Sequence, residues 1–318
     1  MPSPLRPVRR QLRASLHRAY ERLLLREIDG VPTHVAIIQD GNRRFAREHG
    51  QGPDEGHRQG AETARRVLEW CEELGIRELT LYAFSTENFS RPPEELDALF
   101  DLMAEKFREF ADAERVHEAE VAIVPLGDLE RLPERVQAAA RYAAERTADY
   151  DAFRLNVAVA YGGRDELLGA ARGVARAVRA GTLAPDAIDV DEIDRRLAER
   201  PVRDVDLIIR TGGDERTSNF LPWHANGNEA AVFFCAPYWP SFSKVDFLRA
   251  IRTYESREAS WRRTRAERAA ALVRAVGEVE LADARAAAAR LREHLPRAQA
   301  RAVVEELERR EREELAAD

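Results

Sequence analysis

The sequence contains very little cysteine and no long apolar run. Its two cysteines among 318 residues, Cys71 and Cys235, are far apart and lack the spacing of metal ligands. Disulfide-stapled folds and zinc modules are therefore excluded, and both thiols are expected to be buried in a protein of a reducing compartment. No apolar stretch could span a bilayer, and the N-terminal residues lack the apolar segment of a signal peptide. The expected location is the cytoplasm.

Lysine is almost absent as well. Lys106 and Lys244 are the only lysines among the 50 basic residues, and all the others are arginine. GC-rich coding accounts for this bias without any function, whereas a functional explanation is that arginine grips phosphate with two hydrogen bonds. The formal net charge of −7 excludes a general basic field, so no nucleic-acid partner is expected.

Several common catalytic signatures are missing. The chain has no Walker A run, and no Gly-x-Gly-x-x-Gly follows its first apolar run. It also lacks the Gly-x-Ser-x-Gly elbow and the helical Asp-Asp-x-x-Asp run of the trans-type prenyl synthases. These absences argue against P-loop kinases, dinucleotide enzymes, common serine hydrolases and trans-type synthases.

Short, continuously apolar runs alternate with helical stretches through the middle of the chain. Continuous apolar runs are typical of parallel strands that are buried on both faces. The alternation predicts an α/β fold with a mainly parallel central sheet. The expected strands are Val35–Ile38, Leu79–Phe84, Val121–Leu126, Leu155–Ala160, Val205–Ile209 and Ala231–Cys235, and the expected helices cover about 57–74, 94–118, 133–148, 164–180 and 190–199.

The two ends of the chain differ from this middle part. We expect a basic amphipathic N-terminal helix within 1–30, which either packs on the domain or contacts an anionic membrane surface. Residues 31–255 are expected to form the main domain. Residues 256–318 are rich in Arg, Glu and Ala and predict a helical extension, either as support for a dimer or as a solvated tail.

The first polar cluster follows the first expected strand and reads Asp40-Gly-Asn-Arg-Arg-Phe45. The carboxyl ends of parallel strands lie along one edge of the sheet, where open α/β folds bind ligands. A carboxylate at that edge can ligate Mg²⁺, and Gly41 permits a turn that exposes backbone N–H groups to an anion. An ordinary Asp-Gly turn with solvated arginines is the alternative.

The second cluster, Ser85-Thr-Glu-Asn-Phe-Ser-Arg91, ends at a Pro-Pro-Glu-Glu helix start. Arg91 therefore stands just before a helix N-terminus, where positive potentials add. The alternative is that these residues only cap the helix.

The third cluster runs from Arg210 through Gly212-Gly213 to Arg216, Thr217 and Ser218. Two arginines, a Gly pair and hydroxyl groups at a strand exit suit a diphosphate, although a structural Gly-Gly turn is the alternative. Two single residues are also candidates. Glu229 would otherwise be a strand-edge carboxylate, and His57 would otherwise be a capping or solvated histidine.

In this order, the three clusters resemble the undecaprenyl diphosphate synthase family of cis-prenyltransferases over about residues 31–255. The resemblance implies a six-stranded, largely parallel sheet, a homodimer and Mg²⁺-dependent condensation of isopentenyl diphosphate with an allylic diphosphate. It implies these roles: Asp40 and Glu229 as metal carboxylates; Gly41, Asn42, Arg43 and Arg44 on the allylic diphosphate; Phe45 and Phe89 in place of tryptophans; His57 near the phosphates; Ser85, Thr86 and Glu87 in the substrate loop; Asn88 as proton acceptor; Arg91 on phosphate; and Arg210, Arg216, Thr217 and Ser218 on isopentenyl diphosphate.

The chain departs from the family pattern in two places. Pro53 replaces a phosphate-binding arginine of bacterial members, which shifts the expected grip to Arg43 and Arg44. The C-terminal Arg-x-Gly that some members lend across the dimer has no counterpart after Arg257. The long tail and scarcity of lysine resemble archaeal members, whose starter is expected to be geranylgeranyl diphosphate. The expected product is a polyprenyl diphosphate of about undecaprenyl length, the precursor of a glycosyl carrier lipid.

The growing product needs an apolar channel. Apolar residues at helical spacing after the second cluster are candidates for its wall, with core packing as the alternative: Leu96, Leu99, Phe100, Met103 and Phe107. Rival hypotheses are a farnesyl diphosphate starter, a non-catalytic prenyltransferase subunit and a diphosphate phosphohydrolase. A non-catalytic subunit would lack the metal carboxylate and the arginines, and a phosphohydrolase would need a water-activating base that the sequence does not offer.

Overall fold

The computed structural model describes residues 18–197, 204–225 and 230–277, with side chains described up to residue 260. By compactness the chain divides into a unit Met1–Tyr254 and a unit Glu255–Asp318. Within the second unit, the described residues continue helix α9 to Gly277. The predicted segments 1–30, 31–255 and 256–318 remain a prediction.

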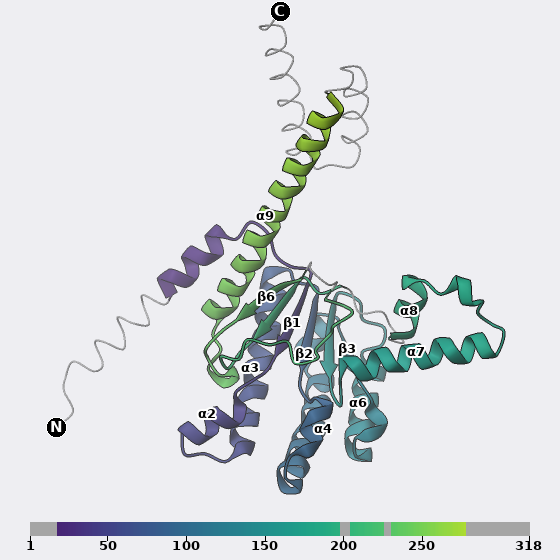
Figure 1. Cartoon of the computed structure of the whole chain (residues 1–318). Coiled ribbons are helices and arrows are strands. Elements are labelled where there is room, and N and C mark those ends of the chain that lie inside the picture. Colours follow the sequence, from purple (N-terminus) through teal and green to yellow (C-terminus); the bar gives the residue numbers. More distant parts are fainter. Residues whose placement is uncertain (1–17, 198–203, 226–229, 278–318) are drawn as a thin grey trace, which may run out of the picture. The chain divides into compact units, whose positions relative to one another are not determined.

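A six-stranded sheet forms the centre of the first unit, in the order β3-β4-β2-β1-β5-β6, and every neighbouring pair is parallel (Figure 1). The predicted α/β fold is therefore confirmed. The second strand ends earlier than expected because the backbone N–H groups of Ala83 and Phe84 both donate to Ala158 beyond the ladder. The strands are β1 (His34–Ile38), β2 (Glu78–Tyr82), β3 (Val121–Leu126), β4 (Phe153–Ala158), β5 (Leu207–Arg210) and β6 (Ala231–Phe234).

The strand order reverses beside β1, and this reversal positions the site. From β1 the chain moves to β2 on one side, and β5 later pairs with the other side. Ile38 is in register with Tyr82 and with Arg210, so the loops after these three strands leave the sheet side by side. Such a topological switch point opens a crevice in which α/β folds bind ligands.

Helices connect the strands, and two of them differ from expectation. The polar run after β1 is not a loop, because α2 begins directly after the turn at Gly41. The long helix expected after the second cluster is interrupted at Ala113, which has extended backbone angles. The helices are α2 (Asn42–Glu48), α3 (Pro53–Leu74), α4 (Pro93–Asp112), α5 (Glu114–Glu118), α6 (Glu134–Arg146), α7 (Gly163–Arg179), α8 (Val190–Leu197) and α9 (Lys244–Gly277).

The sheet is buried on both faces, as its continuous apolar runs predict. The larger core packs one face, which includes Val35 and Ile37, against α3, α4 and α6. A smaller core around Ala36 and Ile38 packs the other face against Phe220. Residues Cys71 and Cys235 are buried free thiols, as expected.

The N-terminal helix is described from residue 18 to residue 27. Its Leu24 is fully buried against Val245 and Leu248 of α9, which supports packing on the domain. Tyr20 and Leu23 stay exposed, so membrane contact remains a prediction. None of the described helices combines the length and the apolar character that a membrane crossing requires.

Candidate active site

Asp40 lies immediately beyond β1, and its backbone is fixed on two sides. The Thr211 hydroxyl after β5 donates to the Asp40 carbonyl at 2.7 Å and accepts from its N–H at 3.0 Å. The N–H of Trp239 donates to the same carbonyl at 3.0 Å. Gly41 follows with φ of 107°, and a Cβ there would lie 2.7 Å from the Tyr238 ring, so only glycine fits this turn.

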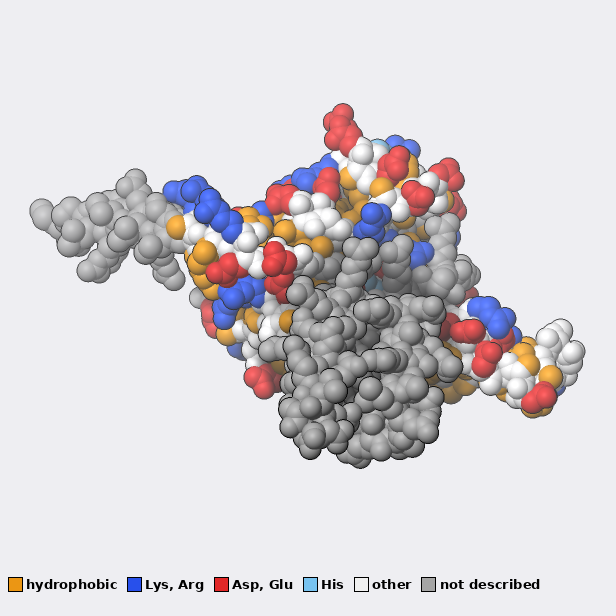
Figure 2. Space-filling view, turned by 90° about the horizontal axis from the view of Figure 1, so that it is seen from above, with side chains coloured by type: hydrophobic (Ala, Val, Ile, Leu, Met, Phe, Trp, Pro, Cys, Tyr) orange, Lys and Arg blue, Asp and Glu red, His pale blue; other side chains and the backbone are white. Residues whose placement is uncertain are grey.

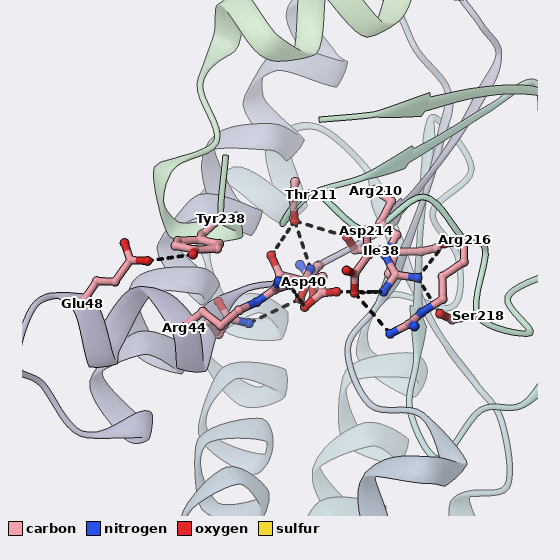
Figure 3. A network of polar contacts seen from close by, with 12 residues as sticks. Ile38, Asp40, Arg44, Glu48, Arg210, Thr211, Asp214, Arg216, Ser218 and Tyr238 are labelled. Carbon is pink, nitrogen blue, oxygen red and sulfur yellow. Dashed lines mark hydrogen bonds and ion pairs between the residues drawn. The ribbon is translucent and has the colours of Figure 1, made fainter. Parts of the chain in front are cut away.

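The Asp40 carboxylate is held between two arginines (Figure 3). Arg44 donates to one oxygen at 2.9 Å and Arg210 to the other at 2.8 Å. Burial raises the pKa of Asp40, but the hydrogen bond from Arg210 and the charge of Arg44 outweigh burial and hold the pKa below its usual value. Asp40 is therefore an ionised carboxylate at neutral pH.

Arg210, the last residue of β5, is almost fully buried and organises the third cluster. Its guanidinium donates to the Arg216 carbonyl at 2.6 Å, to the Ser218 hydroxyl at 2.5 Å and to Asp214 at 3.2 Å. Arg216 itself pairs with Asp214, and its side chain is 70% exposed. Residues that the sequence groups into one cluster therefore also lie together in the structure. The buried Arg210 holds the loop, and the exposed Arg216 extends from it.

Arg44 is positioned from behind by an aromatic ring. Its guanidinium lies 5.3 Å from the centroid of Tyr238, and the Tyr238 hydroxyl donates to Glu48 at 2.7 Å. Gly212 leaves space for the same guanidinium, because a Cβ there would lie 2.7 Å from an Arg44 nitrogen. This network fixes the direction in which Arg44 presents its positive charge (Figure 3).

A polar cavity of about 270 Å³ opens beside Asp40. Four arginines face two aspartates across it, an excess of positive charge suited to an anion. On the face shown in Figure 2, by contrast, basic and acidic side chains of the described residues are interleaved. The cavity is lined by Gln39, Asp40, Gly41, Asn42, Arg43, Arg44, Arg91, Asp214 and Arg216.

Glu95, in the first turn of α4, lies near two arginines and a histidine. Its carboxylate lies 3.2 Å from Arg91, 3.6 Å from Arg43 and 3.9 Å from His57. Burial and the nearby charge of Arg43 lower the pKa of Arg91, and Glu95 opposes this change. Arg91 stays charged, since guanidinium groups do not deprotonate in proteins. Two like charges are thus held close together, an arrangement that a bound anion would stabilise.

We expect Glu95→Gln to weaken the binding of pyrophosphate about tenfold, because Arg43 and Arg91 would lose the carboxylate that positions them. Isothermal titration calorimetry measures the affinity. Glu94→Gln is the matched control, since Glu94 is exposed one residue earlier. Equal affinities in the two variants would show that Glu95 does not position the arginines.

Buried polar atoms without partners are concentrated in this region. Among the described residues, the Nε atoms of Arg91 and Arg210, the Nε2 of His57 and the Oδ1 of Asn42 are buried and have no hydrogen-bond partner in the protein. Native proteins leave few such atoms, and each carries a desolvation cost. Asn42 and Arg91 line the polar cavity, and His57 lines the adjoining apolar one. Unpartnered polar atoms at these walls indicate a site prepared for a polar ligand.

His57 is neutral at physiological pH. Burial, followed by the charges of Arg91 and Arg43, lowers its pKa to about 4. Because the folded pKa lies below the unfolded value of 6.5, the unfolded state takes up the proton first as the pH falls. The stability that neutral His57 contributes is therefore complete above pH 6.5 and is lost as the pH falls toward 4.

The free energy of unfolding is expected to drop by about 2 kcal/mol from His57 alone between pH 7 and pH 5. His57→Gln should remove that part of the acid sensitivity, whereas replacement of the exposed His49 should not. Urea unfolding at the two pH values measures the difference. An undiminished pH effect in the His57 variant would mean that His57 is not buried in the neutral form.

An apolar cavity of about 140 Å³ adjoins the polar one, and both are lined by Gln39 and Asn42. It lies between α3, α4 and the sheet, with His57 and Trp239 also on its wall. Of the predicted channel residues, Leu99, Met103 and Phe107 line it. Leu96 and Phe100 do not, and Phe100 packs instead against Phe84 and Phe89 in the core.

The structure does not bring every predicted residue to the polar cavity. Asn88 and Ser85 form a capping box, in which the Asn88 Oδ1 accepts from the Ser85 N–H at 3.0 Å, as the capping alternative predicts. Phe89 packs on Phe84, and Phe45 stacks on His49. The lining of the polar cavity also lacks Thr86, Glu87, Arg210, Thr217 and Ser218, and His57 lines only the apolar cavity. Glu229 lies outside the described residues.

Several residues of the site were missed by the sequence interpretation. Gln39 links the two cavities, Asp214 bridges Arg210 and Arg216, and Glu95 and Tyr238 position arginines. In the sequence, Glu95 is recognisable only as part of the Pro-Pro-Glu-Glu helix start. Its spacing from Arg91, four residues along the chain, was the one available signal, because carboxylate and arginine at that spacing pair on a helix.

Comparisons with known proteins agree with this geometry. Residues 38–262 match the family model described as "Putative undecaprenyl diphosphate synthase". A protein of Halobacterium salinarum named tritrans,polycis-undecaprenyl-diphosphate synthase (geranylgeranyl-diphosphate specific) is 69% identical over 87% of this chain and 91% of its own length. A protein of Haloarcula marismortui with the same name is 63% identical over 87% of this chain and 91% of its own length.

The fold is also similar to a solved structure. Lavandulyl diphosphate synthase from Lavandula x intermedia, in complex with dimethylallyl diphosphate, superposes with a TM-score of 0.65 at 33% identity, over 70% of this chain and 95% of that one. Sequence match, fold and the arginine-lined cavity beside Asp40 agree. The chain belongs to the undecaprenyl diphosphate synthase family of cis-prenyltransferases.

Proposed function

We propose that this protein condenses isopentenyl diphosphate with geranylgeranyl diphosphate, in repeated steps, to a polyprenyl diphosphate of about undecaprenyl length. The observation that carries the proposal is the junction of a cationic cavity with an apolar one through Gln39 and Asn42. An allylic diphosphate has this same division into a charged head and an apolar tail. Both archaeal relatives named above are geranylgeranyl-diphosphate specific, which supports this starter rather than farnesyl diphosphate.

The arginines divide into two groups that suit two diphosphates. Arg43, Arg44 and Arg91 surround the start of α2 and are assigned to the allylic diphosphate. Arg210 holds the loop that contains Arg216, Thr217 and Ser218, and this group is assigned to isopentenyl diphosphate. Two diphosphates repel each other strongly, so their approach requires fixed cations on both sides.

The residues present fit Mg²⁺, which we propose as the cofactor. The Asp40 carboxylate is ionised and lies at the cavity, and Mg²⁺ prefers one or two carboxylates together with phosphate oxygens. Within the described ranges, no cluster of three or more His, Cys, Asp or Glu side chains could hold a metal without such help. Glu229 is proposed as the second carboxylate. When bound, Mg²⁺ would neutralise charge on the leaving diphosphate.

The side chains of this protein would act mainly by orienting the two substrates and stabilising charge. The allylic C–O bond breaks and diphosphate leaves, while Arg43, Arg44 and Arg91 stabilise its growing negative charge. The double bond of isopentenyl diphosphate forms the new C–C bond with the allylic carbon, and one proton is then lost. Asn88 is proposed to accept this proton, which requires its Oδ1 to leave the capping box with Ser85. The held geometry makes the new double bond cis.

Three further assignments belong to the proposal. The product would serve as the precursor of a glycosyl carrier lipid. A homodimer is supported by exposed apolar side chains at and near α7 and α8: Leu168, Ile188 and Val190. Peripheral membrane contact through the N-terminal helix is supported by exposed Tyr20 and Leu23 and would help to release an apolar product.

Labelled isopentenyl diphosphate tests the proposal directly. The purified protein is incubated with Mg²⁺ and either geranylgeranyl or farnesyl diphosphate, and the products are separated by chain length. With the geranylgeranyl starter, we expect a long-chain product that carries the label. The kcat/KM for this starter should be clearly higher than that for farnesyl diphosphate. Label that stays unincorporated with every starter would support a non-catalytic subunit, and release of phosphate alone would support a phosphohydrolase.

A further inference from the structure

The wall of the apolar cavity contains one permanently charged side chain among its described lining residues, that of Lys106. Lys106 is also one of only two lysines in the chain. Its stem lines the cavity, while its ammonium group lies 2.5 Å from Glu109 and 3.6 Å from Glu62. Burial lowers the pKa of Lys106, but its hydrogen bond and ion pairs, first with Glu109, outweigh burial and raise the pKa. The lysine is thus charged and directed out of the cavity.

The ion pairs of Lys106 cross from one helix to another. Glu62 belongs to α3, whereas Lys106 and Glu109 belong to α4. A second pair, Arg58 with Glu105, joins the same helices at 3.8 Å. We call these five residues the α3–α4 seam. Apart from His57, the residues that α3 presents to the cavity are small, namely Gly60, Ala61 and Ala64. On this side of the cavity, the ion pairs of the seam therefore join the two helices where α3 offers little apolar surface.

The cavity is too small for the proposed product. Its volume of about 140 Å³ is close to that of an engineered protein cavity of about 150 Å³ that holds one benzene molecule. An undecaprenyl chain has eleven isoprene units, each nearly as large as benzene. A wall must move as the chain grows. The sheet side is fixed by continuous parallel ladders, whereas the seam depends on partly exposed ion pairs, which are weak.

We propose that the α3–α4 seam is a lateral gate of the product channel and that Lys106 sets how readily it opens. The proposal rests on the proposed function. As isoprene units are added, the growing chain pushes the helices apart and must break the Lys106–Glu62 pair. Without that pair, less free energy is needed to open the seam around a long chain. Elongation therefore continues further before the product is released. Lys106 is thereby a residue that determines product length.

The test compares product lengths in four variants, each normalised to its own total product. Lys106→Met keeps an apolar stem and removes the charge, and Glu62→Gln removes the same pair from a residue outside the cavity wall. Lys106→Arg restores the charge. Lys244→Met is the matched control, because the second lysine also pairs with two carboxylates, Glu21 and Glu73, but does not line the cavity.

Lys106→Met and Glu62→Gln are expected to raise the fraction of products longer than the main wild-type species about two- to fivefold. Lys106→Arg and Lys244→Met should give the wild-type distribution. Unchanged or shorter products from folded Lys106→Met would overturn the proposal. So would longer products from Lys106→Met but not from Glu62→Gln, because only the volume of the wall would then matter. Failure of the wild-type protein to incorporate any label would instead reject the proposed function itself.

Discussion

Asp40→Asn is expected to lower kcat about a thousandfold or more while leaving the protein folded. The change keeps the shape of the side chain and removes the charge that would hold Mg²⁺ and order Arg44 and Arg210. A metal ion supplies several kcal/mol of transition-state stabilisation, and each ~1.4 kcal/mol corresponds to a factor of ten in rate. Steady-state turnover of labelled isopentenyl diphosphate measures the effect.

The fold should survive this change because Arg210 retains its bonds to Asp214, Ser218 and the Arg216 carbonyl. Thermal unfolding checks this point. Asp214→Asn is the matched control, since Asp214 lines the same cavity and contacts the same guanidinium. We expect its turnover to fall only about tenfold, the effect of one charge-assisted hydrogen bond. Near-normal turnover by a folded Asp40→Asn protein would contradict the assignment.

Arg210→Met is expected to reduce kcat/KM for isopentenyl diphosphate about a thousandfold and to destabilise the protein by roughly 3 kcal/mol. Arg210 is 3% exposed and holds Asp40, Ser218 and the Arg216 carbonyl together. Its loss would disorder the isopentenyl diphosphate loop and leave Asp40 paired only with Arg44. Steady-state kinetics and urea unfolding measure the two effects separately.

Arg210→Lys separates charge from geometry. Lysine restores the positive charge, but its donors all lie on one nitrogen and cannot reach the four partners that the two guanidinium nitrogens of Arg210 reach. Most of the stability should therefore return while kcat/KM stays about a hundredfold low. Arg141→Met on α6 is the control for loss of an exposed arginine, and both quantities should stay at wild-type values. Full activity in the lysine variant would show that only the charge of Arg210 matters.

The fold was predictable because one signal dominates it. Parallel strands buried on both faces must be continuously apolar, and all six strands occur where such runs stand, with small shifts at their ends. The α2 helix was missed since it is short, polar and begins directly at a glycine turn. The break at Ala113 was missed because alanine favours a helix, so nothing in its own preference marks the interruption.

The site was predictable to the extent that its residues follow strand ends. Asp40 and Arg210 meet because the ends of β1 and β5 are neighbours, a consequence of the strand order. A contact between α2 and the loop after β6 has no such pattern, so the sequence does not predict the position of Tyr238 beneath Arg44. The local sequence did not decide between the two roles considered for Asn88, because capping and proton acceptance require the same amide, and the structure shows capping of a turn through its Oδ1. Pro53 begins α3 and is exposed, and it offers no N–H to a phosphate.

Asp40 and the surrounding arginines are proposed to bind a diphosphate together with Mg²⁺. Isothermal titration calorimetry of pyrophosphate, with and without Mg²⁺, measures this directly in the wild-type protein and in Asp40→Asn. We expect Mg²⁺ to strengthen binding to the wild-type protein at least about tenfold and most of this gain to disappear in the variant. An equal gain from Mg²⁺ in both proteins would contradict the proposal.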